Sequence, residues 1–91
     1  MKVFACKRGG GYSGGLAIVA ANNKEEAFNI FACHEDYNWI LNNLDEETGE
    51  YTNDVTKCDG FYYKRADWFE LPMLTANVDK PQVLIENGYT E

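Results

Sequence analysis

The sequence predicts a small α+β domain in which a mostly antiparallel sheet of three to five strands carries one or two helices on one face. Three observations predict this class. Short apolar stretches of strand length lie near both ends of the 91-residue chain. Between them, apolar residues recur at intervals of three and four, as in an amphipathic helix. The length suits one domain, residues 1–91, with a thin core. The expected order is β-β-α-(α)-β-β.

Two strands are expected near the N-terminus. Lys2–Lys7 alternates, with Val3 and Ala5 on one side and Phe4 and Cys6 on the other. Leu16–Ala21 is apolar throughout, so we expect a strand that is buried on both faces. The two strands and the glycine-rich segment between them predict a hairpin with a long tip.

A helix is expected to begin after Asn23, because Asn is a favoured N-cap and Glu26 stands three residues later, as in a capping box. The apolar positions that follow are spaced by three and four: Ala27, Ile30, Phe31, His34, Tyr37, Leu41 and Leu44. The spacing fits one helix of about twenty residues, or two helices that break near Glu35 and Asp36. The sequence leaves both alternatives open.

The second half of the chain predicts shorter elements. Residues 45–60 are polar and turn-rich, which predicts a loop or a weak hairpin through Tyr51. Residues 61–63 are expected to form a short extended piece, and residues 67–71 a strand that Pro72 ends. Residues 82–86, opened by Pro81, should form the last main strand.

The ends of the predicted sheet raise the question of self-association. Asn87-Gly88 predicts a type I′ turn, after which residues 89–91 fold back. Residues 2–7 or 82–86 are expected as an exposed edge strand, through which copies of the chain could pair into a homo-oligomer.

Negative charge is concentrated in one window. Residues 35–59 hold eight acidic residues and one lysine. The net charge of this window is therefore −7, the same as the net charge of the whole chain. An acidic protein is disfavoured as a nonspecific nucleic-acid binder. The window predicts either a solvated face or a docking surface for a basic protein partner. The expected contact residues are Asp45, Glu46, Glu47, Glu50 and Asp54.

Residues 8–15 contain five of the eight glycines. The spacing fits the G-x-G-x-x-G motif, but a predicted strand follows it where a dinucleotide site needs a helix. Two hypotheses remain. Backbone N–H groups, with the basic residues beside them, would hold a phosphate-bearing small molecule, or the loop is a hairpin tip that docks on a partner through Tyr12. The candidate ligand-binding residues are Lys7, Arg8, Gly9, Gly10, Gly11, Tyr12, Ser13 and Gly14.

No metal, cofactor or catalytic group is expected. Cys33 and His34 are adjacent and would point about 100° apart on a helix, which does not suit one tetrahedral ion. Residues 45–56 fail as a calcium loop, because the glycine stands at the wrong position and Thr56 replaces the final Glu. His34 lies on the apolar stripe and is expected to pack and hydrogen-bond rather than catalyse. Ser13, the only serine, has no nucleophile-elbow pattern around it.

The remaining composition predicts a noncatalytic cytoplasmic protein. No apolar run approaches the roughly 20 residues of a membrane span. Cys6, Cys33 and Cys58 are expected to be free, buried thiols. Residues 61–69 mix aromatic and basic side chains, which is the composition of a single-strand nucleic-acid surface. The acidity disfavours that interpretation, and aromatics at strand spacing more often belong to the core.

Two parts of the chain resemble small proteins without an assigned activity that bacterial phages and prophages carry. The first comprises Arg8-Gly9-Gly10-Gly11-Tyr12-Ser13-Gly14-Gly15, Ala20-Ala21-Asn22 and Glu25-Glu26-Ala27. The second comprises Trp68-Phe69-Glu70-Leu71-Pro72, residues 74–78, residues 80–84 and Gly88-Tyr89-Thr90-Glu91. The resemblance implies an accessory protein of a bacterial cytoplasm that binds host proteins. It carries over no role for any residue.

Overall fold

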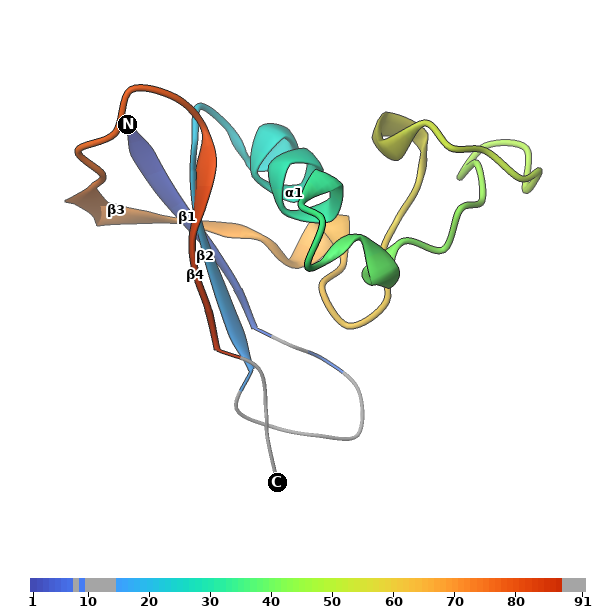
Figure 1. The fold of residues 1–91 in the computed structure, drawn as a ribbon, viewed down its shortest axis with the longest axis horizontal. Coiled ribbons are helices and arrows are strands. Elements are labelled where there is room, and N and C mark those ends of the chain that lie inside the picture. The colour runs from blue at the N-terminus through green and yellow to red at the C-terminus, as the bar shows by residue number, and fades with distance from the viewer. Residues whose placement is uncertain (8, 10–14, 88–91) are drawn as a thin grey trace.

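A computed structural model describes residues 1–7, 9 and 15–87, apart from the side chains of Glu86 and Asn87. Within that part of the chain, a four-stranded antiparallel sheet carries one α-helix (Figure 1). The elements are β1 (Lys2–Lys7), β2 (Leu16–Ala21), α1 (Lys24–Cys33), β3 (Phe69–Thr75) and β4 (Gln82–Asn87), with short 3-10 turns η1 (Asn38–Ile40), η2 (Val55–Lys57) and η3 (Arg65–Asp67). The predicted α+β class and the order β-β-α-β-β are confirmed.

The first two strands form the predicted hairpin at the centre of the sheet. β1 and β2 pair in register from Lys2 opposite Ala21 to Lys7 opposite Leu16. The strand order is β3-β1-β2-β4, so β3 and β4 are the edges. The prediction of an edge at residues 2–7 is therefore wrong, because β3 pairs with β1 from a distant part of the chain. The alternative, an edge at residues 82–86, agrees with the position of β4.

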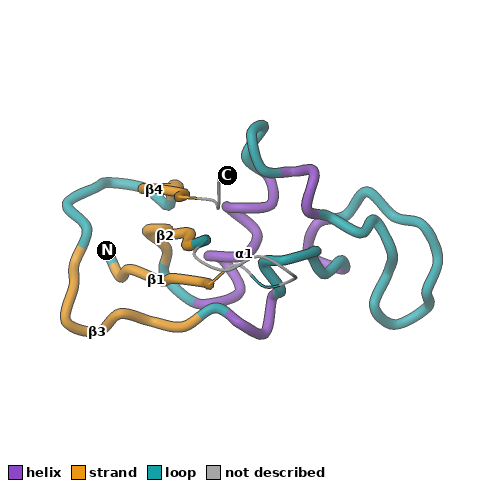
Figure 2. The backbone as a smooth tube through the Cα atoms, turned by 90° about the horizontal axis from the view of Figure 1, so that it is seen from below, coloured by secondary structure: helices purple, strands orange, loops and turns teal. Residues whose placement is uncertain are grey.

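The main core lies between the sheet and α1, which covers one face of the sheet (Figure 2). Phe31 of α1 is fully buried, stacks on Tyr37 at 4.6 Å and contacts the rings of Tyr63 and Trp68. The strand residues on this side are Phe4, Cys6, Ala17, Val19 and Ala21, and α1 contributes Ala27, Phe28 and Ala32 as well. Burial of large aromatics gives this small core much of its apolar area.

The helix begins where the sequence predicts. The side chain of Asn23 accepts a hydrogen bond from the Glu26 N–H at 2.8 Å, which satisfies one free donor of the first turn. The Glu26 carboxylate in turn accepts from the N–H and side-chain amide of Asn22. The Asn23 cap and the Glu26 carboxylate therefore both stabilise the N-terminus of α1.

The single helix of about twenty residues is wrong, and the chain breaks close to Glu35 and Asp36, as the two-helix alternative expects. α1 ends at Cys33, because His34 takes an extended conformation and its Nδ1 accepts the Asp36 N–H at 3.1 Å. The chain then turns into η1 instead of a second α-helix. Leu41 and Leu44 continue the helical spacing in sequence but lie in an irregular segment beyond it.

Two other sequence predictions need correction. β3 passes through Pro72, because the register slips from Phe4 opposite Glu70 to Lys2 opposite Thr75, and proline is tolerated at such an irregularity on an edge strand. Residues 61–63 are not extended, because Tyr62 has φ 69° and the segment turns. The predicted turn and return strand after Asn87 lie outside the described residues.

Candidate protein-binding surface

The acidic window forms a lobe that projects from the sheet and helix. We call residues 41–60 the acidic lobe. It is an irregular hairpin in which Leu41 lies opposite Gly60 and Leu44 opposite Tyr51. In Figure 1 it occupies the end of the molecule away from the sheet. The predicted weak hairpin through Tyr51 is thereby confirmed.

Backbone hydrogen bonds hold the lobe together without regular strands. The Asp45 N–H donates to the Glu50 carbonyl at 2.8 Å, and the Glu46 N–H to the Lys57 carbonyl at 2.9 Å. The Thr52 N–H donates to the Asn43 carbonyl at 2.9 Å. Pairs from opposite sides of the hairpin therefore give its backbone a defined conformation.

Two of the predicted contact residues help to build the lobe. Asp45 Oδ1 accepts the Glu47 N–H at 2.7 Å, and Asp54 Oδ1 accepts the Thr56 N–H at 3.0 Å. Hydrogen bonds from the Thr56 hydroxyl and N–H lower the pKa of Asp54, because they favour its ionised form. The side chains of Asp45 and Asp54 thus define turns of the lobe.

Arg65 fastens the lobe to the helix. One guanidinium nitrogen donates to the carbonyls of Val55 at 2.7 Å and Cys58 at 2.6 Å. The other donates to Asn29 and Glu25 of α1 at 2.9 and 3.1 Å. Its carbon lies 4.2 Å from the centre of the Phe28 ring, as in a cation–π contact. Arg65 is thus an anchor between the lobe and α1.

The other three predicted contact residues face solvent. Glu46, Glu47 and Glu50 are exposed, and the ion pairs of the described residues, His34–Asp36 and Arg65–Glu25, involve none of them. The structure also brings part of the predicted set together. A pocket of about 310 Å³ is lined by Asp45, Glu46, Glu47, Thr56, Lys57 and Arg65.

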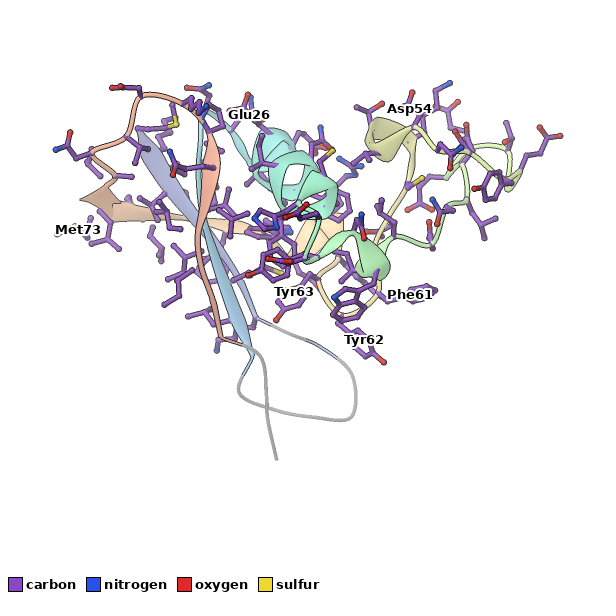
Figure 3. The ribbon with its side chains drawn as sticks, viewed as in Figure 1. Glu26, Asp54, Phe61, Tyr62, Tyr63 and Met73 are labelled. Atoms are coloured by element: carbon purple, nitrogen blue, oxygen red, sulfur yellow. The ribbon has the colours of Figure 1, made fainter. Side chains whose placement is uncertain are left out.

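Exposed aromatic rings lie at the base of the acidic lobe. Trp39 is 54% exposed, Phe61 is 57% exposed, and the rings of Trp39 and Tyr62 are 5.9 Å apart. Phe61 and Tyr62 project below η1 in Figure 3. The prediction of core aromatics in residues 61–69 is confirmed for Tyr63 and Trp68 but wrong for Phe61 and Tyr62. The exposure of Trp39 has no local signal in the sequence, because the next residue, Ile40, is buried.

The predicted ligand site in the glycine-rich segment is mostly outside the described residues. Lys7 is exposed at the end of β1. The Gly9 N–H donates to the Tyr62 carbonyl at 2.8 Å, which links this segment to the aromatic turn. Arg8 and residues 10–14 are not described, so binding of a phosphate-bearing molecule there stays a prediction.

Among the described residues, the histidine and the three cysteines form no cluster of three or more metal-binding side chains. His34 is hydrogen-bonded, as predicted, but half-exposed, with its ring 4.8 Å from that of Tyr37. Burial and the nearby Asp67 raise the pKa of Cys6 to about 12, so its thiol stays protonated. Cys58 is buried too, but Cys33 is exposed at the last position of α1, which corrects the prediction of three buried thiols.

Two further features are absent from the described residues, 1–7, 9 and 15–87. No cluster of three or more His, Cys, Asp or Glu side chains suited to a metal ion occurs among them. No helix in this part of the structure has the length and apolarity to cross a membrane.

No family model, curated protein or solved structure matches this chain. Any functional assignment therefore depends on the arrangement of its own residues.

Proposed function

We propose that this chain is a noncatalytic protein-binding module that recognises a basic protein partner through the acidic lobe. The observation that supports the proposal is the exposure of Glu46, Glu47 and Glu50, outside any ion pair of the described residues, on a hairpin that Arg65 fastens to α1.

The electrostatics of the lobe favour a cationic partner. Residues 45–57 hold five carboxylates and one lysine. Like charges gathered on one projection attract an oppositely charged surface over a distance of about one Debye length, and so accelerate encounter. Complementary charge also selects among partners.

The construction of the lobe favours binding as well. Its hydrogen-bonded turns and the Arg65 anchor restrict the backbone before any partner arrives, which lowers the entropic cost of association. Trp39 and Phe61 at its base provide exposed aromatic area of the kind that is enriched in interfaces.

The cellular setting is part of the same proposal. The resemblance to phage and prophage proteins favours an accessory role in a bacterial cytoplasm. The free state of Cys6, Cys33 and Cys58 is compatible with a reducing compartment.

The test is capture of partners from bacterial lysate at low and at high salt, with two charge-reversal variants. The lobe variant is Glu46→Lys, Glu47→Lys and Glu50→Lys. It spares Asp45, whose carboxylate builds a turn. The control is Glu35→Lys, Glu70→Lys and Asp79→Lys, which changes the net charge equally at exposed positions elsewhere.

We expect a partner that the native chain and the control capture at low salt and that the lobe variant loses. The same partner should be released at high salt, because exposed charges are screened. Equal capture by both variants, or capture that salt does not affect, would contradict the proposal.

A further inference from the structure

The face of the sheet away from α1 carries a continuous apolar row. The strand register places Ala5 opposite both Phe69 of β3 and Ile18 of β2, and Ile18 opposite Ile85 of β4. Directly paired residues point to the same side of a sheet. None of these four residues belongs to the core against α1, so the row crosses all four strands on the other face.

Among the described side chains that strand pairing places on this face, only Lys7 and Gln82 are polar. An antiparallel sheet with one covered face usually alternates apolar and polar residues along its strands. Strand pairing also places Val3, Ala5 and Ala20 on this side, where they are buried, next to the half-buried Leu16 and Ile18. Of the described side chains that strand pairing places there, Lys7 carries the only charge.

A projection stands beside the row. The register slip in β3 pushes out the segment around Pro72, so that Met73 is 93% exposed and Leu74 is 53% exposed. Figure 3 shows Met73 on the side of the sheet away from α1. Phe69 and Ile85 in the row are themselves 43% and 53% exposed. A projection next to an apolar row can be complementary to a second copy of itself.

We propose that two copies of this chain stack through these faces, with the Met73–Leu74 projection of each copy against the Phe69–Ile85 row of the other. Such packing would remove the exposed side chains of Phe69 and Ile85, on the two edge strands, from water. The interaction is independent of the proposed partner of the acidic lobe.

The exposed area is compatible with a dimer. The four side chains Phe69, Met73, Leu74 and Ile85, together with the half-buried neighbours in the row, expose on the order of 500 Å². This lies within the range of about 300–600 Å² for the largest apolar patch on a monomer, and such a patch often marks an interaction site. Two such patches would bury about 1,000 Å², the lower limit for a specific interface.

The charge distribution favours a second copy as the occupant. Asp54 in the acidic lobe and Met73 lie at opposite ends of the molecule in Figure 3. Stacking through the face away from α1 keeps the two acidic lobes at the outer ends of the dimer, where screening limits their repulsion. A dedicated basic partner would find no carboxylate among the paired side chains of this face.

The test is sedimentation velocity of the full chain over a range of concentrations, at low and at high salt. We expect a species of twice the monomer mass that persists at high salt, because its contacts are apolar. Met73→Lys should weaken self-association about tenfold or more, the effect of 1.4 kcal/mol. Because Met73 is almost fully exposed, this change should leave the fold intact.

A paired design controls for general effects of added lysine. Phe69→Lys with Ile85→Lys should give monomers. Leu44→Lys with Phe61→Lys should leave the dimer unchanged, since these side chains are similarly exposed but lie in or beside the acidic lobe.

Three results would overturn the proposal. One is a monomer at every concentration, and another is equal loss of the dimer in the control pair. The third concerns the backbone amides of β4 that point away from β2. If they became protected from hydrogen exchange as the concentration rose, the copies would pair through the β4 edge and not through the sheet faces.

Discussion

The sheet-and-helix body and the acidic lobe are stabilised in different ways. In the body, Phe28, Phe31 and Trp68 are buried against strands and helix. In the lobe, Tyr51 and Leu44 are exposed, and hydrogen bonds and Arg65 replace a core. The difference shows how a small protein can present a dense negative surface. Burial of a carboxylate costs free energy, so the segment that carries the carboxylates stays exposed. Hydrogen bonds from Arg65 to its backbone carbonyls hold it against the body instead.

The largest expected effect is on the body. Phe31→Ala removes a fully buried ring that contacts Tyr37, Tyr63 and Trp68, and should lower the free energy of unfolding by about 3–5 kcal/mol. Urea unfolding measures the loss. Met73→Ala at an exposed site is the control and should change stability by less than about 0.5 kcal/mol. A small effect of Phe31→Ala would show that the described core is wrong.

The next largest effect should separate the lobe from the body. Arg65→Ala leaves the Val55 and Cys58 carbonyls without their donor and should cost about 2–3 kcal/mol. Hydrogen exchange should accelerate more in residues 41–60 than in β1 and β2. Arg65→Lys should restore little, because an ammonium group cannot reproduce the fork of the guanidinium.

The exposed neighbour Lys64 provides the control for this change. Lys64→Ala should leave exchange in the lobe unaltered. Equal acceleration of exchange in the sheet and the lobe of Arg65→Ala would show that the two regions unfold as one cooperative unit. That result would contradict the separate stabilisation of the lobe.

A smaller effect is expected at the start of α1. Asn23→Ala removes the acceptor of the Glu26 N–H and should destabilise the protein by about 1 kcal/mol. Thermal unfolding of this variant should show a lower midpoint, with Asn77→Ala at an exposed loop position as the control. Exchange in the lobe should change little, unless the helix end and the lobe are coupled through Asn29 and Arg65.

The smallest effect concerns pH. The folded-state pKa of Asp54 lies below its ordinary value of 3.8, so the ionised carboxylate contributes stability above that pH. This contribution is lost as the pH falls from about 3.8 through the lowered pKa. NMR titration of the Thr56 amide should report the transition. Asp54→Asn should abolish it, whereas Glu47→Gln should leave it in place.

Local features of the sequence predicted much of the body. The limits of β1 and β2 follow from two apolar stretches around a glycine-rich segment, and the N-cap follows from Asn23 and Glu26. The charged window also predicted where the candidate surface would lie. These features depend on residues close in sequence, so they can be recognised without knowing the fold.

Contacts between distant residues decided the rest. The pairing of β1 with β3 made β1 a central strand, and the register slip carried β3 through Pro72. The use of Arg65 as an anchor needed α1 and the lobe on either side of it.

The sequence by itself therefore determined the class of fold, the central hairpin, the start of the helix and the position of the negative charge. Only the tertiary structure decided which acids build turns and which face solvent, and which aromatic rings remain exposed. It also decided that one face of an apolar sheet has no helix over it in the described part of the chain. The physical reason is that periodicity and capping act within a few residues, whereas burial depends on which segments meet.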